Sequence, residues 1–227
     1  MKKGLILIGL LWMSLTALHA QGERMGGQDR IVMELNWNSW LNTPDGIEQR
    51  WFSRGLNVFF MYDLQLGNSP FSIAPGFGIG TDNVYHNGRF VATDTQTVMV
   101  PIPDSIDVKG NKINTTYLEV PFEIRFRTKP NDKGRSWKIA AGVRGGLLIS
   151  NHIKYRGEGA TFGFPQAEVK YKEHNVPNLD NLRYGATFRV GYGPVNLHAY
   201  YGLSSLFESG QGPELVPFHI GLSINGL

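Results

Sequence analysis

The sequence of 227 residues contains no cysteine. The absence of thiols excludes disulfide bridges, thiol nucleophiles and thiolate metal sites. It also excludes anchoring through a lipid on a cysteine. The stability of the fold must therefore come from backbone pairing and side-chain packing.

Long hydrophobic runs are also missing, apart from one short stretch near the start. Residues 4–15 are apolar, follow Lys2 and Lys3, and precede the small-residue sequence Ala17-Leu18-His19-Ala20. This three-part pattern is typical of a secretory signal peptide, and the run is shorter than the roughly 20 residues of a spanning helix. We expect residues 1–20 to be a signal peptide and residues 21–227 to form the exported domain.

The sequence has little excess charge of either sign. Without Lys2 and Lys3, 20 basic residues face 19 acidic ones, so the formal net charge falls from +3 to +1. This balance gives no indication of nucleic-acid binding. What the sequence does contain is 28 glycines with 13 Phe, 9 Tyr and 5 Trp. Such a composition suits short strands, tight turns and aromatic belts better than helices.

Eight segments alternate between apolar and polar residues with a period of two, as strands with two different faces do. They are residues 30–41, 54–66, 71–81, 114–128, 137–150, 181–192, 195–207 and 216–225. The fourth is the clearest, because Leu118, Val120 and Phe122 alternate with charged or polar side chains. We therefore predict an all-β fold, an eight-stranded antiparallel transmembrane β-barrel with up-and-down connections.

Alternation alone does not say which face meets water, because a soluble lipocalin-like barrel alternates with its apolar face inward. Two features favour a membrane barrel. Glycines are frequent on the polar face, where a narrow lumen accommodates them, and long connections alternate with short ones. The long connections are residues 42–53, 82–113, 151–180 and 208–215. We predict an outer-membrane barrel with these loops outside and both termini in the periplasm, and a soluble periplasmic barrel is the alternative.

The polar face of this barrel is predicted to carry six basic and four acidic side chains into the lumen. They are Glu34, Asp63, Glu119, Glu123, Arg125, Arg127, Lys138, Arg144, Arg183 and Arg189. Buried ions without partners cost several kcal/mol, so we expect a closed charge network that plugs the lumen. Open channels belong to barrels of roughly 16 strands, so general porin activity is not expected.

Sequence patterns typical of catalytic and metal sites are not found. The histidines His86, His152, His174, His198 and His219 are scattered, and no Gly-x-Ser-x-Gly elbow surrounds a serine. There is no His-Glu-x-x-His motif, no acidic calcium loop and no strand with paired histidines. We assign no catalytic residue, no metal site and no cofactor.

The two longest loops are the segments most exposed to possible partners. Residues 97–103 are apolar and β-prone, which predicts either a rim hairpin that packs on itself or a docking segment. Residues 151–180 carry Lys154, Arg156, Lys170 and Lys172 among aromatic side chains. Anionic headgroups of lipopolysaccharide are a suitable partner for such a basic belt, and a solvated loop is the alternative.

Three phrases of the sequence are similar to a known family. They are Thr116-Tyr117-Leu118-Glu119-Val120-Pro121-Phe122-Glu123-Ile124-Arg125-Phe126-Arg127, Lys138-Ile139-Ala140-Ala141-Gly142-Val143-Arg144-Gly145-Gly146 and Gly210-Gln211-Gly212-Pro213-Glu214-Leu215. The chain resembles the PorT-type outer-membrane β-barrel family of Bacteroidota. The resemblance implies a small outer-membrane barrel and, for some members of that family, a role in type IX protein secretion.

The leading functional prediction is a non-enzymatic outer-membrane barrel that serves as a structural or accessory subunit of an envelope complex, such as type IX secretion or outer-membrane assembly. Its expected partners are outer-membrane lipid, lipopolysaccharide and envelope proteins. The alternatives are a lipid-modifying enzyme with a histidine and a serine near the outer rim, and a narrow channel or small-ligand carrier.

Overall fold

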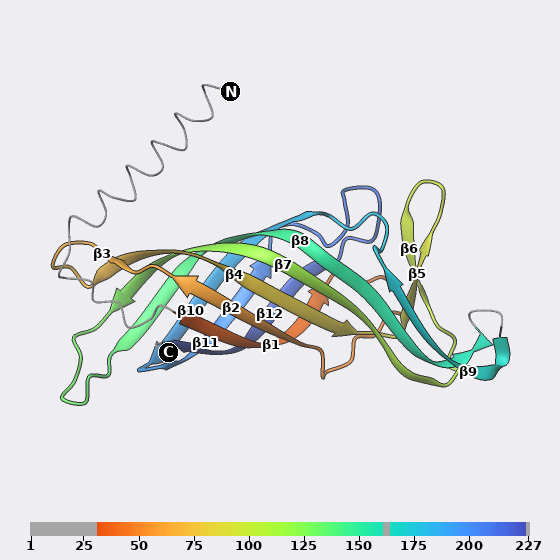
Figure 1. The fold of residues 1–227 in the computed structure, drawn as a ribbon, viewed down its shortest axis with the longest axis horizontal. Helices are drawn as coiled ribbons and strands as arrows, with labels where there is room; N and C mark the ends of the chain where they lie inside the picture. Colours follow the sequence, from red (N-terminus) through yellow and green to blue (C-terminus); the bar gives the residue numbers. More distant parts are fainter. Residues whose placement is uncertain (1–30, 161–163, 226–227) are drawn as a thin grey trace, which may run out of the picture.

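Eight strands close into a ring in the computed structural model, which describes residues 31–160 and 164–225. The predicted signal peptide lies outside the described residues. The strands of the ring are β1 (Ile31–Leu41), β2 (Arg54–Met61), β4 (Phe71–Tyr85), β7 (Val108–Arg127), β8 (Trp137–Gly159), β10 (Leu182–Tyr192), β11 (Val195–Gly202) and β12 (Val216–Asn225). Each pairs antiparallel with the next, and β12 pairs with β1 to close the ring (Figure 1). The predicted eight-stranded antiparallel barrel is confirmed.

Four further strands lie at the two ends of this ring. At one end, which we call the turn end, β3 (Leu64–Gln65) pairs with β4 near short connections. At the other, which we call the loop end, β5 (Gly88–Ala92) and β6 (Thr97–Pro101) form a separate hairpin, and β9 (Phe164–His174) pairs with β8. Figure 1 shows the hairpin and β9 at the opposite end from β3. The alternation of short and long connections therefore separates the two ends as predicted.

The outward face of the ring is apolar all the way round. Leu35, Phe77, Val120, Leu182 and Leu197, from five different strands, are each about 60% exposed. A soluble monomer rarely exposes a continuous apolar surface of this extent, whereas a lipid bilayer accepts it. No helix in the described part of the chain is long and apolar enough to cross a membrane.

Three strands are longer at the loop end than the sequence predicts. β4 continues to Tyr85, β7 begins at Val108 and β8 continues to Gly159. The predicted loops 82–113 and 151–180 are therefore wrong over much of their length. Their alternation was hidden because polar side chains replace apolar ones on the outward face once the strands pass beyond the apolar belt.

A bulge at Ile149 marks this change. Thr116 pairs with Ser150 and Tyr117 pairs with Leu148, so one residue of β8 is extra. Beyond the bulge, the odd-numbered side chains of β8 are buried and the even-numbered ones point outward. Before the bulge the even-numbered side chains of β8 face the lumen, and after it the odd-numbered side chains face inward.

Two other strand boundaries differ from the prediction. The second predicted strand breaks after Met61, opposite Pro75, which has no N–H to donate across the ladder. The seventh ends at Gly202 instead of residue 207. Leu206 and Phe207 leave the sheet because they are buried beneath the loops, in the cluster described next.

An apolar cluster closes the loop end of the ring. We call it the cap, and it consists of Trp40, Ile47, Val84, Met99, Ile113, Ile153, Val176, Leu179, Leu206, Phe207 and Leu215. The β5–β6 hairpin contributes Met99 to it, and the Thr97 amide donates to the Gln211 carbonyl. Residues 97–103 thus belong to a rim hairpin that packs onto the barrel itself.

Candidate functional site

The predicted inward-facing charges meet in one network along the lumen. Acidic and basic groups alternate from the turn end to the loop end, with neighbouring charged atoms within 4 Å of each other. The order is Asp63, Arg125, Glu123, Arg189, Glu34, Arg144, Glu119, Arg183, Asp82 and His219, with Arg127 paired to Asp63. Strands from opposite sides of the ring are therefore joined through their side chains.

Glu34 of β1 lies at the centre of this network and is 1% exposed. Arg144 of β8 donates to both oxygens of its carboxylate, at 3.0 and 2.8 Å, and Arg189 of β10 donates to Oε1 at 3.2 Å. Asn57 donates to Oε2 at 2.8 Å. A carboxylate with four such bonds has its desolvation cost offset by charge-assisted partners.

Aromatic rings surround the arginines in the half of the lumen nearer the loop end. The Arg183 guanidinium lies 3.8 Å from the centre of the Tyr117 ring, and the Arg144 guanidinium lies 4.5 Å from that of Phe59 and 5.4 Å from that of Tyr200. Arg183 also pairs with Asp82 and, at 2.8 Å, with Glu119. Cation–π contacts of this kind stabilise cations that have lost their water.

Little free volume remains between these side chains. One cavity of about 10 Å³ is lined by Arg125, Arg127, Lys138 and Arg189 near the turn end, and another of about 10 Å³ is lined by Asp82, Arg183 and His219 near the cap. A cavity needs roughly 10–15 Å³ to hold one water molecule. Lys138, the remaining predicted lumen residue, is half-buried at the turn end.

One acidic side chain and two histidines of the lumen are not in the predicted set: Asp82, His198 and His219. Asp82 falls in the predicted loop 82–113, and the sequence does not distinguish the two histidines from the other scattered ones. Asp82 continues the series of inward-facing even-numbered residues Gly76, Gly78 and Gly80, so the alternation of β4 indicates that Asp82 faces the lumen. With Asp82, five carboxylates face the six predicted basic side chains, which halves the apparent excess of positive charge.

Glycines create the space for the network where it is most crowded. A Cβ atom added at Gly80 would lie 2.4 Å from Glu119 Oε2 and 2.8 Å from Asn57 Oδ1. At Gly146 it would lie 3.2 Å from both Arg183 Cγ and Glu119 Cγ. Two glycines thus flank the Glu119–Arg183 pair, as expected for a narrow lumen.

Among the described residues, no histidine is hydrogen-bonded to a serine, and no histidine–aspartate ion pair lies at the lipid-facing rim, where the enzyme alternative requires such a pair. His219 lies 3.6 Å from Asp82, but both are buried in the lumen. His198 lies 3.9 Å from Glu34 in the same lumen. His86 is buried against the cap, where burial lowers its pKa to about 4 and its Nδ1 accepts a hydrogen bond from the Gly88 amide.

The remaining two histidines face each other across β8 and β9. The ring centres of His152 and His174 are 5.5 Å apart, a cross-strand pair that the sequence did not reveal because β9 was predicted as loop. Burial and the neighbouring Lys172 and His174 lower the pKa of His152. A surrounding of lysines disfavours a bound cation. Among the described residues, no group of three histidine or acidic side chains is placed to hold a metal ion.

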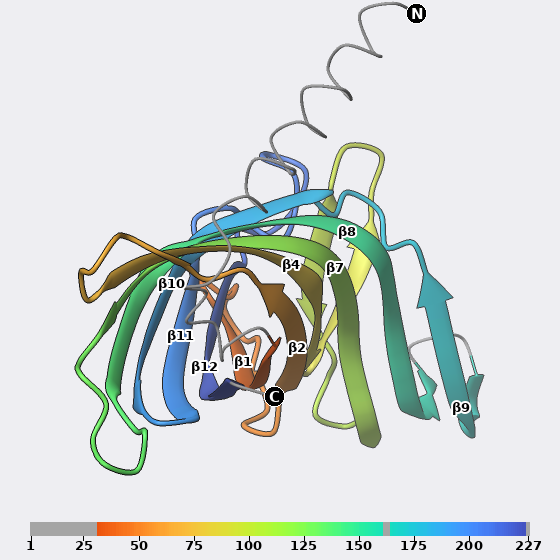
Figure 2. The ribbon, with the colours of Figure 1, turned by 60° about the vertical axis from the view of Figure 1, so that its left-hand side comes forward.

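Beyond the Ile149 bulge, β7, β8 and β9 form a sheet that extends past the apolar belt. We call residues 108–115, 150–159 and 164–174 the projecting sheet, and Figure 2 shows its three strands side by side, with β9 at the outer edge. The outward face carries Lys112, His152, Lys154, Arg156, Lys170, Lys172 and His174. Glu168 balances part of this charge through Lys109 at 2.7 Å and Arg156 at 3.0 Å. The sheet thus presents a basic face directly above the apolar belt.

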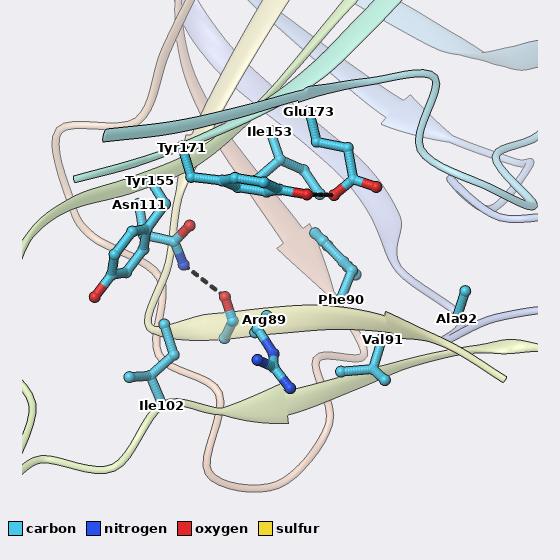
Figure 3. A pocket seen from close by; sticks show the side chains of 11 residues that line it. Arg89, Phe90, Val91, Ala92, Ile102, Asn111, Ile153, Tyr155, Tyr171 and Glu173 are labelled. Carbon is cyan, nitrogen blue, oxygen red and sulfur yellow. Dashed lines mark hydrogen bonds between the residues drawn. The ribbon is translucent and has the colours of Figure 1, made fainter. Parts of the chain in front are cut away.

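The opposite face of the projecting sheet borders a cavity of about 260 Å³. The sheet supplies Asn111, Ile153, Tyr155, Tyr171 and Glu173, and the β5–β6 hairpin supplies the facing wall. In Figure 3, Tyr171 and Glu173 lie on one side of the cavity and Phe90 on the other. The Tyr171 hydroxyl donates to Glu173 Oε2 at 2.8 Å. This cavity is much larger than the two small spaces of the lumen.

Comparison with solved structures gives similarity to Ail, the attachment invasion locus protein of Yersinia pestis, with 14% identity, a TM-score of 0.34, and coverage of 86% of this chain and 95% of Ail. The structure of Ail in complex with the heparin analogue sucrose octasulfate gives 12% identity, a TM-score of 0.31 and the same coverage. No curated protein matches the sequence.

The family model described as outer membrane protein beta-barrel domain matches residues 29–208. This match spans most of the chain and includes seven of the eight strands of the ring. The chain therefore belongs to the outer-membrane β-barrel domain family, and it is a protein of the bacterial outer membrane.

Proposed function

We propose that this protein is a non-enzymatic scaffold of the outer membrane whose working surface is the projecting sheet. The observation that supports the proposal is the contrast between the filled lumen of the barrel and the strands that extend beyond the apolar belt at the loop end. Buried ion pairs and the apolar cap fill the ring, whereas β7 and β8 continue beyond the belt and acquire β9 as a third strand. Strands that only need to span the bilayer require about 9–11 residues, and β8 has 23.

A filled lumen argues against a channel. An eight-stranded ring is just wide enough for side chains to fill it, and here those side chains are ion-paired in a lumen with little free volume. Purified protein in planar bilayers is expected to give no discrete conductance steps. Reproducible steps in the wild type that become larger when a lumen arginine is replaced by alanine would overturn this part of the proposal.

The basic face is proposed to contact the phosphates of lipopolysaccharide. Lys154, Lys170 and Lys172 point outward on the same side as Leu147 and Ile149 of the apolar belt. At about 3.3 Å per residue, Lys154 lies within roughly 17 Å of Ile149 along the strand. In the proposed orientation, with the loop end outward and both termini in the periplasm, this is the zone of the charged headgroups.

The lipid contact can be tested by titrating lipopolysaccharide into the protein in a zwitterionic detergent. Each lysine near an anionic membrane surface contributes about 1 kcal/mol, so Lys154→Ala with Lys172→Ala should weaken binding roughly 30-fold. The matched control is Lys129→Ala with Lys133→Ala in the exposed connection at the turn end. Equal losses in the two double variants would contradict a specific role for the basic face.

More specifically, we propose that the protein is an accessory subunit of an envelope complex, such as the type IX secretion or outer-membrane assembly machinery. It rests on the resemblance to PorT-type barrels and on a projecting sheet that is larger than a membrane anchor needs. Crosslinking in cells followed by purification is expected to recover protein partners attached to residues of the projecting sheet. Recovery of the barrel alone, together with intact secretion in a deletion strain, would refute it.

A further inference from the structure

We propose that the cavity between the β5–β6 hairpin and the projecting sheet is a binding site for a single uncharged sugar ring. The cavity measures about 260 Å³, slightly below the roughly 300–1,000 Å³ typical of drug-sized ligands. A ligand of one ring fits this volume, whereas a folded peptide segment or a lipid acyl chain exceeds it. The proposal concerns the inner face of the projecting sheet and is independent of the contact proposed for its basic outer face.

The walls of the cavity are built for a ligand with one apolar face. Tyr155, Ile153 and Ile102 are at most 9% exposed and form an apolar floor. Tyr171 remains 37% exposed, and Phe90 lies across the cavity from it (Figure 3). Aromatic faces are electron-rich, so they attract the positively polarised C–H groups on one side of a pyranose ring.

Two polar side chains, Glu173 and Asn111, line the same cavity and can bond the hydroxyls of such a ring. The Glu173 carboxylate is held by the Tyr171 hydroxyl through Oε2, which leaves Oε1 to accept from a ligand hydroxyl. The Asn111 side-chain amide is fixed by its bonds to the carbonyls of His86 and Gly88, at 3.1 and 2.5 Å. Both polar groups are therefore oriented before a ligand enters, which lowers the entropy cost of binding.

The charges around the cavity favour a neutral ligand. The cavity is lined by one acidic and one basic side chain, Glu173 and Arg89. An anion would meet the Glu173 carboxylate, and a cation would meet the Arg89 guanidinium and the positive field of the lysines on the other face of the same sheet, which are Lys112, Lys154 and Lys172. A purely apolar ligand would desolvate Glu173 Oε1 without offering it a hydrogen bond. A polyhydroxylated ring meets none of these penalties.

The proposal is tested by saturation-transfer NMR on the full chain. The protein is prepared in a zwitterionic amine-oxide detergent, because glucoside and maltoside detergents would occupy the site. The probes are glucose, galactose, mannose and N-acetylglucosamine, each at 10 mM. We expect transfer to at least one of them, with a dissociation constant on the order of 1 mM for a ligand of this size.

Strand β9 supplies its own control, because alternate residues face opposite sides. Tyr171→Ala and Glu173→Gln should each weaken binding at least tenfold, whereas Lys172→Ala should leave it unchanged. Tyr171→Phe keeps the ring and should retain more affinity than Tyr171→Ala. Retention of the heat-modifiable gel shift shows that each variant is folded.

Two results would overturn the proposal: no transfer to any of the four sugars, or transfer that persists in folded Tyr171→Ala. Loss of lipopolysaccharide binding in Lys172→Ala with intact sugar binding would separate the two faces, so the two proposals can fail independently.

Discussion

Glu34→Gln tests whether the lumen network stabilises the barrel as its geometry implies. The substitution keeps the shape of the side chain and removes the charge that Arg144 and Arg189 share. Removing one partner of a buried ion pair typically costs 3–5 kcal/mol. Here each arginine keeps a second carboxylate, Glu119 at 3.7 Å for Arg144 and Glu123 at 2.7 Å for Arg189. We therefore expect a loss at the lower end of that range, about 3 kcal/mol.

The assay is urea unfolding in lipid vesicles, followed by tryptophan fluorescence and by gel mobility of unheated samples. Glu168→Gln is the matched control, because Glu168 also accepts from two basic side chains but is 42% exposed, and it should cause no measurable change. In the background of Glu34→Gln, Arg144→Met should cost less than it does alone, because it removes a cation that has lost half of its partners. A loss below about 1 kcal/mol in Glu34→Gln, or full additivity of the two substitutions, would refute the reasoning.

Three further outcomes are expected. Gly80→Ala should slow folding into vesicles and destabilise the barrel, because its Cβ would lie 2.4 Å from Glu119 Oε2. Gly110→Ala should be tolerated, because a Cβ there has no neighbouring atom within 4 Å, and urea unfolding compares the two variants. Leu222→Arg on the lipid face, where Leu222 is 50% exposed, should cost roughly 2–4 kcal/mol if it lies near the bilayer midplane, and it should lower the yield of folded protein. Because burial lowers the pKa of His86 to about 4, the neutral form is the one that the folded cap accepts. The stability that neutral His86 provides should be complete above pH 6.5 and fall by about 3 kcal/mol as the pH drops to 4. The difference in unfolding free energy between the wild type and His86→Gln, measured across this pH range, tests the prediction. A difference that does not depend on pH would contradict the lowered pKa of His86.

The barrel could be predicted from the sequence because membrane strands leave little freedom. Every residue of the ring faces lipid or a narrow lumen, so apolar and polar residues such as Leu118 and Glu119 must alternate. The alternation therefore indicates where the strands are and which side chains face lipid, and a sheet in the membrane must close because it cannot leave an edge unpaired. The same parity identified Glu34, Arg144 and Arg189 as inward-facing. Asp82 was missed only because its strand was ended too early.

The projecting sheet could not be predicted in the same way. Outside the bilayer, both faces of a strand accept polar side chains. The alternation of apolar and polar residues that identifies a membrane strand is therefore missing between Lys109 and Thr116. The bulge at Ile149 then reverses the parity of β8, and a bulge is a property of the pairing between β7 and β8. The pairing of His152 with His174 likewise depends on a strand whose pattern does not differ from that of a charged loop.

The position of the least predictable segment bears on function. The lipid face of the ring must stay apolar and the lumen must keep its charges balanced, so substitutions on either surface are opposed by the folding of the barrel itself. Beyond Ile149 neither constraint applies, because water solvates the backbone edges and the charges alike. Residues such as Lys154 and Tyr171 are therefore not required by the membrane fold. A basic face and an aromatic cavity on the two sides of one strand, β9, need a different explanation, and the two binding functions proposed above are consistent with both.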